Sequence, residues 1–169
     1  MVKLKLSTIK EGRSSFEIEA ATADVELQDN EQFSHPIRLS FDCNKIGDEI
    51  FVALKTNTVV DLICDVCLEP FSMKLNESVD ILLAKDQELV EREEDDVYLI
   101  PDSTNEIDIT DSIKQTLLLA IPLKKVCRSG CKGLCPICGA NLNENPCACE
   151  RKKTDPRWDA LKGIKFDKE

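Results

Sequence analysis

The cysteines of this chain constrain its fold more than any other feature, because most of them lie close together near the C-terminus. Six of the nine fall within 23 residues: Cys127, Cys131, Cys135, Cys138, Cys147 and Cys149. Cys64 and Cys67 form a separate Cys-x-x-Cys pair far upstream. Such short spacings are typical of structural zinc sites, because tetrahedral Zn²⁺ takes thiolates that tight loops present in pairs.

The C-terminal cysteines predict one compact Cys₄ site. Cys135-Pro-Ile-Cys138 has the form of a zinc knuckle, in which two intervening residues allow both sulfurs to reach one metal ion. The following Gly139 permits a turn that directs backbone N–H groups at the thiolates. The second pair is less usual for zinc, since it is a Cys-x-Cys. The first predicted ligand set is Cys135, Cys138, Cys147 and Cys149.

The upstream pair predicts a second zinc site if two more thiols join it. Cys127 and Cys131 are the obvious partners, and the set Cys64, Cys67, Cys127 and Cys131 would close a loop of about 60 residues through the metal. The alternatives are one site of mixed membership with spare cysteines packed as small hydrophobes, an iron–sulfur site, or a redox pair. One or two zinc ions are therefore expected. They would be structural, because four thiolates leave no open position for water.

Length and composition predict one main domain with a small appendage. The 169 residues are 42% hydrophobic, which is enough for a core. No apolar stretch reaches the roughly 20 residues of a membrane span, and the N-terminus lacks the apolar run of a signal peptide. The odd number of cysteines also disfavours a secreted disulfide scaffold. We therefore expect a cytoplasmic protein with reduced thiols and no membrane partner.

The charge of the chain is unevenly distributed. Residues 1–121 carry 26 acidic and 11 basic side chains, whereas residues 122–169 carry 6 acidic and 11 basic ones. A basic segment in an acidic chain is a candidate surface for nucleic acid, although a fully ligated Cys₄ zinc site carries a formal charge of −2 that offsets part of it. The candidate phosphate-contacting residues are Lys124, Lys125, Arg128, Lys132, Arg151, Lys152 and Lys153.

The first hundred residues are patterned as strands. Apolar and polar residues alternate at 2–6, 16–20 and 37–41, which predicts strands with one buried face. Residues 50–63 predict one long central strand or two joined at 55–57, and residues 73–83 and 97–100 predict two more. The acidic run at 91–96 has no apolar period and predicts an exposed loop. The predicted fold class is α+β, with a mainly antiparallel sheet or partly closed barrel.

Helical spacing appears only after these strands. Ile113, Leu117 and Ile121 predict a helix over 111–121, capped by Thr110 or Asp111 and stopped by Pro122. A short terminal helix is predicted from Pro156. The expected organisation is a β-rich main domain over 1–122, then a net-basic, cysteine-rich zinc-knuckle segment over 123–169.

Catalytic patterns are weak in this sequence. His35 is the one histidine, and its place beside Pro36 is typical of a loop residue. No phosphate-binding glycine loop or dinucleotide fingerprint is present, so no small-molecule substrate is predicted. We therefore expect a protein that is not an enzyme, with no catalytic residues.

Four segments, in this order, resemble the bacterial YceD family. They are Cys64-Asp-Val-Cys-Leu-Glu-Pro-Phe71, Glu106-Ile-Asp-Ile109, Cys131-Lys-Gly-Leu-Cys-Pro-Ile-Cys-Gly-Ala-Asn-Leu-Asn143 and Asp155-Pro-Arg-Trp158. The resemblance implies a factor needed for accumulation of 23S rRNA in ribosome assembly, acting on large-subunit rRNA or on a basic ribosomal protein. It places the family's cysteines on Cys64, Cys67, Cys131, Cys135 and Cys138. The alternative function is a thiol redox protein or switch that uses Cys64 and Cys67.

Overall fold

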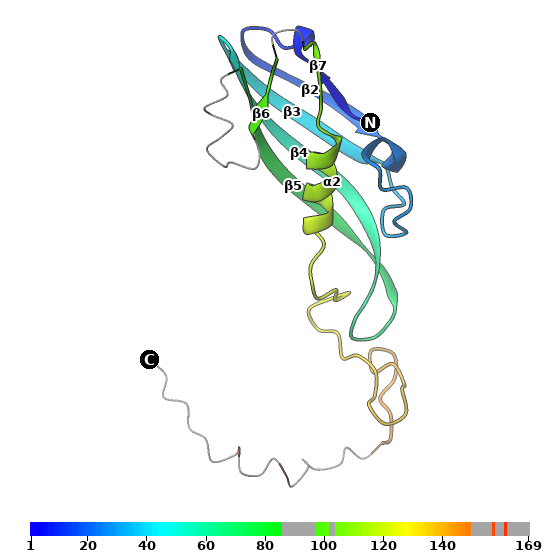
Figure 1. Ribbon diagram of the computed structural model, residues 1–169. Coiled ribbons are helices and arrows are strands. Elements are labelled where there is room, and N and C mark those ends of the chain that lie inside the picture. Colours follow the sequence, from blue (N-terminus) through cyan, green and yellow to red (C-terminus); the bar gives the residue numbers. More distant parts are fainter. Residues whose placement is uncertain (86–96, 102–103, 150–156, 158–160, 162–169) are drawn as a thin grey trace.

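A five-stranded sheet forms the body of the molecule (Figure 1). The computed structural model describes residues 1–85, 97–101, 104–149, 157 and 161. The large sheet has the order β2 (Gly12–Ala20), β3 (Ile37–Ile46), β4 (Glu49–Ile63), β5 (Pro70–Ala84) and β6 (Val97–Leu99). Neighbouring strands are antiparallel except β6, which runs parallel to β5. A small antiparallel sheet joins β1 (Lys3–Lys5) to β7 (Glu106–Asp108).

The alternating sequence pattern is reproduced by the burial of the strands. Along β4, Leu54 and Val60 are buried while Lys55 and Asp61 face solvent. Residues 50–63 lie in one strand at the centre of the sheet, so the prediction of a long central strand is confirmed. The sheets do not close on themselves, and of the two predicted arrangements the structure has the open sheet. The α+β fold class is confirmed.

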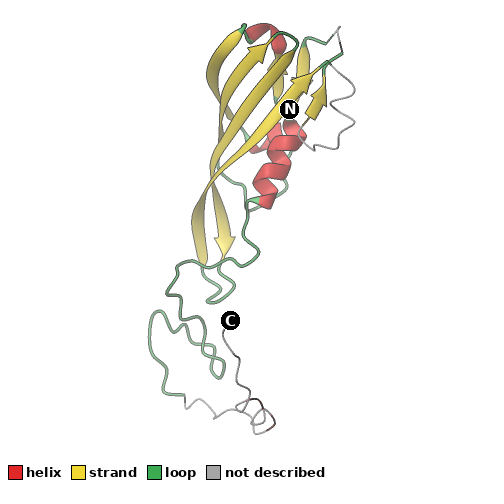
Figure 2. Ribbon diagram, turned by 90° about the vertical axis from the view of Figure 1, so that its left-hand side faces the viewer, coloured by secondary structure: helices red, strands yellow, loops and turns green. Residues whose placement is uncertain are grey.

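Helix α2 (Thr110–Leu119) packs against the inner face of the sheet, as Figure 2 shows. Ile113 and Leu117 are fully buried, which is the face predicted for the helix over 111–121. Two short 3₁₀ helices, η1 (Leu6–Thr8) and η2 (Thr22–Val25), lie among the N-terminal strands. Of the predicted terminal helix only Arg157 and Leu161 belong to the described residues. No helix in the described ranges has the length and apolarity to cross a bilayer.

The predicted caps of this helix are wrong. Ile109 occupies the N-cap position, and neither Thr110 nor Asp111 caps the helix through its side chain. The Asp108 carboxylate instead accepts the backbone N–H of Thr110 at 2.9 Å and also its hydroxyl. The Thr110 hydroxyl does not cap the helix, because its oxygen accepts the backbone N–H of Val2 at 2.8 Å. This bond joins the N-terminal end of the chain to the start of α2.

The β4–β5 hairpin extends beyond the region that α2 covers and carries the first cysteine pair at its tip. The two strands remain paired from Ile50 with Leu83 to Ile63 with Pro70. After α2 the chain runs along this hairpin toward the same tip, where the cysteine-rich segment lies (Figures 1 and 2). The fold thus brings cysteines that are more than 60 residues apart in the sequence to one end of the molecule.

Candidate metal centres

Eight of the nine cysteines form two groups of four. The inner site consists of Cys64, Cys67, Cys127 and Cys131, and the outer site consists of Cys135, Cys138, Cys147 and Cys149. Within each site all four Sγ atoms lie within 4.8 Å of one another. These are the two sets that the spacing predicts, so the structure brings together the thiols of each set and mixes none between them.

The distances between sulfurs fit tetrahedral zinc. In the inner site, Cys64 Sγ lies 3.9 Å from Cys131 Sγ, and Cys67 Sγ lies 3.8 Å from Cys127 Sγ. Four sulfurs at about 2.3 Å from one tetrahedral ion lie about 3.8 Å from each other. A disulfide would instead require about 2.05 Å, and all nine cysteines are free. The inner donor set therefore suits Zn²⁺ in number, type and spacing, and the outer set suits it in number and type.

Both Cys-x-x-Cys loops have the same backbone hydrogen bonds. The N–H of Cys64 donates to the carbonyl of Glu69 at 2.9 Å, and the N–H of Leu68 returns to the carbonyl of Cys64 at 2.9 Å. In the outer site, the same two bonds join Cys135 to Ala140 at 2.8 Å and Gly139 to Cys135 at 2.9 Å. The two Cys-x-x-Cys loops are therefore turns of the same kind.

The fourth position after the first cysteine is left-handed in each turn. Gly139 has φ of 73°, which glycine adopts without steric cost. Leu68 has φ of 61°, where a residue with a Cβ is strained. Its side chain is 62% exposed, so burial does not compensate for this strain. Because the glycine that marks a knuckle is absent at 68, sequence alone identified the first turn only through its cysteines.

The inner site joins the hairpin tip to the cysteine-rich segment, and backbone contacts reinforce the joint. Asp65 and Lys125 exchange two bonds: the Asp65 N–H donates to the Lys125 carbonyl at 2.8 Å, and the Lys125 N–H donates to the Asp65 carboxylate at 2.7 Å. The N–H of Leu134 donates to the carbonyl of Val66 at 3.2 Å. The chain therefore holds these segments in register on both sides of the thiols.

Two asparagines support the inner site from outside the ligand set. The Asn143 amide donates to Cys131 Sγ at 3.4 Å, and its Oδ1 accepts the backbone N–H of Lys132 at 2.9 Å. The Asn141 Oδ1 accepts the Asn143 amide at 2.9 Å, and the Asn141 amide donates to Glu69 Oε1 at 3.4 Å. The spacing of the cysteines in the sequence did not indicate these roles for Asn141 and Asn143. A hydrogen bond from a non-ligand side chain to a ligand sulfur orients the ligand and tunes its basicity.

One thiol in each site ionises readily. Burial acts to raise the pKa of Cys64, but backbone N–H groups, with that of Cys127 foremost, donate to its sulfur and bring the pKa down to about 6. For Cys135 the donors are the backbone N–H groups of Cys138 and Ile137, and its pKa is also about 6. The loops therefore stabilise thiolates, the form that binds metal.

Another thiol in each site resists ionisation. Burial, followed by the neighbouring sulfurs of Cys67 and Cys64, raises the pKa of Cys127 to about 12. The adjacent sulfur of Cys138 has the same effect on Cys149, whose pKa is also about 12. Four thiolates this close repel one another, so a divalent cation among them is the charge that would allow all four to ionise.

The predicted cationic residues fall into two groups. Lys124, Arg128 and Lys132 are exposed and Lys125 is half-buried, and all four alternate along the chain with the ligands of the inner site. Arg151, Lys152 and Lys153 lie outside the described residues. Between 122 and 149 Glu144 is the single acidic side chain. The four described cations therefore lie beside thiolate charge, which they can offset.

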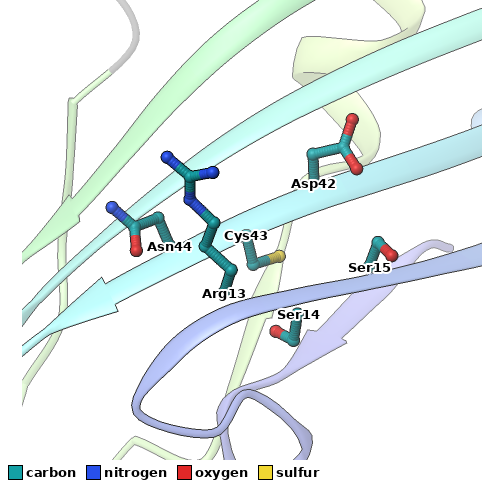
Figure 3. Close-up of a pocket in the computed structure, with 6 residues that line it drawn as sticks. All are labelled: Arg13, Ser14, Ser15, Asp42, Cys43 and Asn44. Atoms are coloured by element: carbon teal, nitrogen blue, oxygen red, sulfur yellow. The ribbon is translucent and has the colours of Figure 1, made fainter.

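Cys43 lies apart from both sites. It is buried in β3, and burial followed by the charge of Asp42 raises its pKa, as expected for an inert thiol. A hollow of about 430 Å³ lies over β2 and β3 at this point. Figure 3 shows Arg13 and Asn44 on one face of these strands, with Ser14 and Cys43 on the other. No second thiol among the described residues joins Cys43 in a metal group.

The surroundings of Cys64 and Cys67 bear on the redox alternative. Cys64 is fully buried and Cys67 is 3% exposed, and both sulfurs lie against thiols of the C-terminal segment. Exchange thiols need access to a partner disulfide. This arrangement favours metal ligation over exchange chemistry. His35 is paired with Asp61 at 3.3 Å in a loop, in keeping with its interpretation as a loop residue.

Comparison with known proteins connects these sites to one family. The family model described as "Large ribosomal RNA subunit accumulation protein YceD" matches residues 52–165, a range that includes all eight grouped cysteines. No solved structure matches the chain.

Three relatives illustrate how far this similarity extends. An Arabidopsis thaliana protein named "Large ribosomal RNA subunit accumulation protein YCED homolog 1, chloroplastic" is 37% identical over 42% of this chain and 22% of its own length. Its Zea mays namesake is 28% identical over 76% of this chain and 53% of its own. An uncharacterised Mycobacterium tuberculosis protein is 34% identical over 58% of this chain and 47% of its own length. The chain thus spans about a fifth to about half of these relatives.

Proposed function

Because the chain belongs to the YceD family of large ribosomal RNA subunit accumulation proteins, we propose that it is a non-enzymatic factor in assembly of the large ribosomal subunit. The observation that carries the proposal is the family match over residues 52–165, which takes in the β4–β5 hairpin, α2 and both cysteine sites. A cytoplasmic location belongs to the same proposal, while the plant relatives are named chloroplastic.

The inner and outer sites each hold one structural zinc ion in this proposal. Support comes from four thiols per site whose sulfurs lie within 4.8 Å of one another, and from sulfur separations of 3.8 Å and 3.9 Å at the inner site. Zinc with four thiolate ligands has no coordination position for water or substrate. The metal would therefore shape the surface at the hairpin tip and perform no chemistry. Its protein ligands are Cys64, Cys67, Cys127 and Cys131 at the inner site, and Cys135, Cys138, Cys147 and Cys149 at the outer site.

The net charge of the cysteine-rich segment, with metal bound, indicates which of its residues would contact rRNA. Two fully ligated sites carry a formal charge of −4, which nearly cancels the net +5 of residues 122–169. Lys124, Lys125, Arg128 and Lys132 would then mainly offset thiolates. Phosphate contact would rest on the run Arg151 to Lys153, whose reversal to Glu should weaken rRNA binding and reduce its salt dependence.

The other partner within this proposal is a basic ribosomal protein. The net-acidic residues 1–121 would attract it, in the manner of a chaperone. A binding comparison at low salt separates the two partners. If large-subunit rRNA fragments fail to bind while a basic ribosomal protein binds, direct RNA contact is rejected and the acidic surface becomes the site of action.

Removal of the gene from its host tests the proposed role directly. We expect the ratio of large-subunit to small-subunit rRNA to fall, and the wild-type chain and Cys43→Ala to restore it. The double variant Cys64→Ser, Cys67→Ser should fail to restore it. An unchanged ratio after removal would reject the role in assembly, whereas restoration by the double variant would reject only the need for the inner zinc.

A further inference from the structure

The strand β5 has a long open edge. On one side it pairs with β4 from Pro70 to Leu83, but on the other side β6 lies opposite Leu82, Leu83 and Ala84 alone. In the described ranges no strand borders residues 70–81 on that side. Unpaired backbone N–H and C=O groups in a row form a template on which a further strand can pair.

A groove accompanies this edge. A hollow of about 860 Å³ lies between β5 and α2. Figure 1 shows that the helix α2 lies over this part of the sheet. Glu77 and Val79 line it from the strand, and Gln115 and Leu119 line it from the helix. Tyr98 of β6 also lines it and is hydrogen-bonded to Ser112 of α2, so the helix and the sheet are tied together there.

We propose that this groove binds an extended polypeptide segment of a partner protein, which adds to the open edge of β5 and places lysine or arginine beside Glu77. An edge strand next to a helix is an arrangement in which extended peptides bind, because the edge supplies backbone bonds and the groove receives alternate side chains. The inference does not depend on the role in ribosome assembly.

The charge of the groove selects the occupant. The Glu77 side chain is exposed, and no ion pair joins it to another described residue. Among the described residues that line the groove there is no lysine or arginine. A second copy paired in an antiparallel ladder centred on the groove would place Glu77 opposite Glu77, an unfavourable like-charge pair in the groove itself, even though Lys74 would then lie opposite Asp80 on the other face. Nucleic acid would be repelled by the same carboxylates, so a basic polypeptide is the matching partner.

The apolar part of the groove defines the rest of the segment. Leu119 is 85% exposed at the end of α2, and Val79 is partly exposed on the facing strand. In the bound peptide, the side chain two residues from the lysine would lie on the same face of the strand. It would point into the groove and could cover both Leu119 and Val79. The expected ligand therefore alternates basic and apolar residues on one face of an extended strand.

Peptide binding to the zinc-loaded full chain tests this proposal. The probe is a capped peptide of about ten residues that repeats Lys-Thr-Val-Thr, so that one face of the strand alternates lysine and valine. Its matched control repeats Lys-Pro-Val-Pro, which keeps the charge but loses every second backbone N–H and favours the polyproline conformation over a paired strand. At low ionic strength we expect the threonine peptide to bind at least ~10-fold more tightly, and to slow amide exchange in residues 70–81.

A pair of charge reversals locates the site. Glu77→Lys should weaken binding by ~10-fold or more, while Glu19→Lys, an equal reversal on the exposed face of β2, should change it little. Equal affinity for the two peptides, or equal loss from both reversals, would mean diffuse attraction and overturn the proposal. A dimer of the free chain with residues 70–81 already protected would assign the groove to a second copy and also overturn it.

Discussion

At the scale of single residues, the inner site depends on groups that are not ligands. Asn143 both donates to Cys131 Sγ and accepts from the Lys132 backbone, so it fixes the loop and favours the thiolate. Its hydrogen bond is the largest cause that lowers the pKa of Cys131. Removing it would leave the sulfur with one donor fewer and the loop less constrained.

We predict that Asn143→Ala weakens zinc binding at the inner site by ~10-fold or more, as loss of an outer-shell hydrogen bond commonly does. Competition with a chromogenic chelator measures the change. The control is Asn145→Ala, because the Asn145 side chain is exposed and makes no side-chain hydrogen bond among those identified. Equal zinc retention by Asn143→Ala and wild type would remove Asn143 from the support of the site.

Gly133 allows the cysteine-rich segment to approach the hairpin tip. Its φ is 72°, and a Cβ at this position would lie 2.7 Å from Val66 Cγ1 and 2.8 Å from the Val66 carbonyl oxygen. We expect Gly133→Ala to lower the free energy of unfolding by roughly 1–3 kcal/mol, since both the strained φ and the overlap must be accommodated.

The matched control for that substitution is Gly130→Ala, whose Cβ would meet nothing within 4 Å. Denaturant unfolding of the zinc-loaded proteins measures both. If the two alanine variants unfold at the same denaturant concentration, the close approach at Val66 does not stabilise the joint.

At the scale of elements, the start of α2 depends on a carboxylate outside the helix. Hydrogen bonds from the Thr110 hydroxyl and backbone hold the pKa of Asp108 below 3.8. A depressed pKa stabilises the folded state above pH 3.8, and this contribution disappears as the pH falls through the folded-state pKa. We therefore predict that Asp108→Asn is less stable than wild type at neutral pH.

The pH dependence distinguishes this charge effect from a packing defect. The stability difference between wild type and Asp108→Asn should shrink below pH 3.8, measured by thermal unfolding of both proteins across the acid range. Metal release at low pH would affect both chains alike. A difference that stays constant with pH would contradict the charge effect.

Most elements of the fold could be predicted from the sequence because period-two alternation is strong in β3 and β4. The pairing of β7 with β1 could not, since residues 106–108 are too few to show a period and their partner lies about a hundred residues away. The start of α2 was misplaced because Thr110 has a capping side chain but uses it to bind Val2. The open edge of β5 depends on strand order, which alternation does not specify.

The cysteine sites also have features that the sequence predicts and features that it does not. The two cysteine sets were predictable because zinc imposes short local spacings on its ligands. Asn143, Gly133 and Asp65 were not singled out, since each acts through a segment that only the fold brings near. At Leu68 the sequence lacks the glycine found at 139, so the cysteines alone marked the upstream turn, and the backbone φ and hydrogen bonds show that it is the same turn as the one at Cys135.

At the scale of the whole molecule, a cysteine-rich segment is fastened to one end of the longest hairpin of an acidic sheet. The hydrophobic core lies between the sheet and α2 and continues along the hairpin to Val60 and Leu62, but none of the described residues 123–149 belongs to it. Contacts at the tip are mostly backbone bonds and thiols, so the attachment of residues 123–149 should depend on metal more than on burial.

Native mass spectrometry of the full chain counts the metal ions on which this attachment is proposed to depend. We predict two zinc ions on the wild-type protein, and one on the double variant Cys64→Ser, Cys67→Ser, because the outer site keeps all four of its proposed ligands. A single zinc on the wild-type chain, or a mass that reports disulfides in place of metal, would contradict the two-site account.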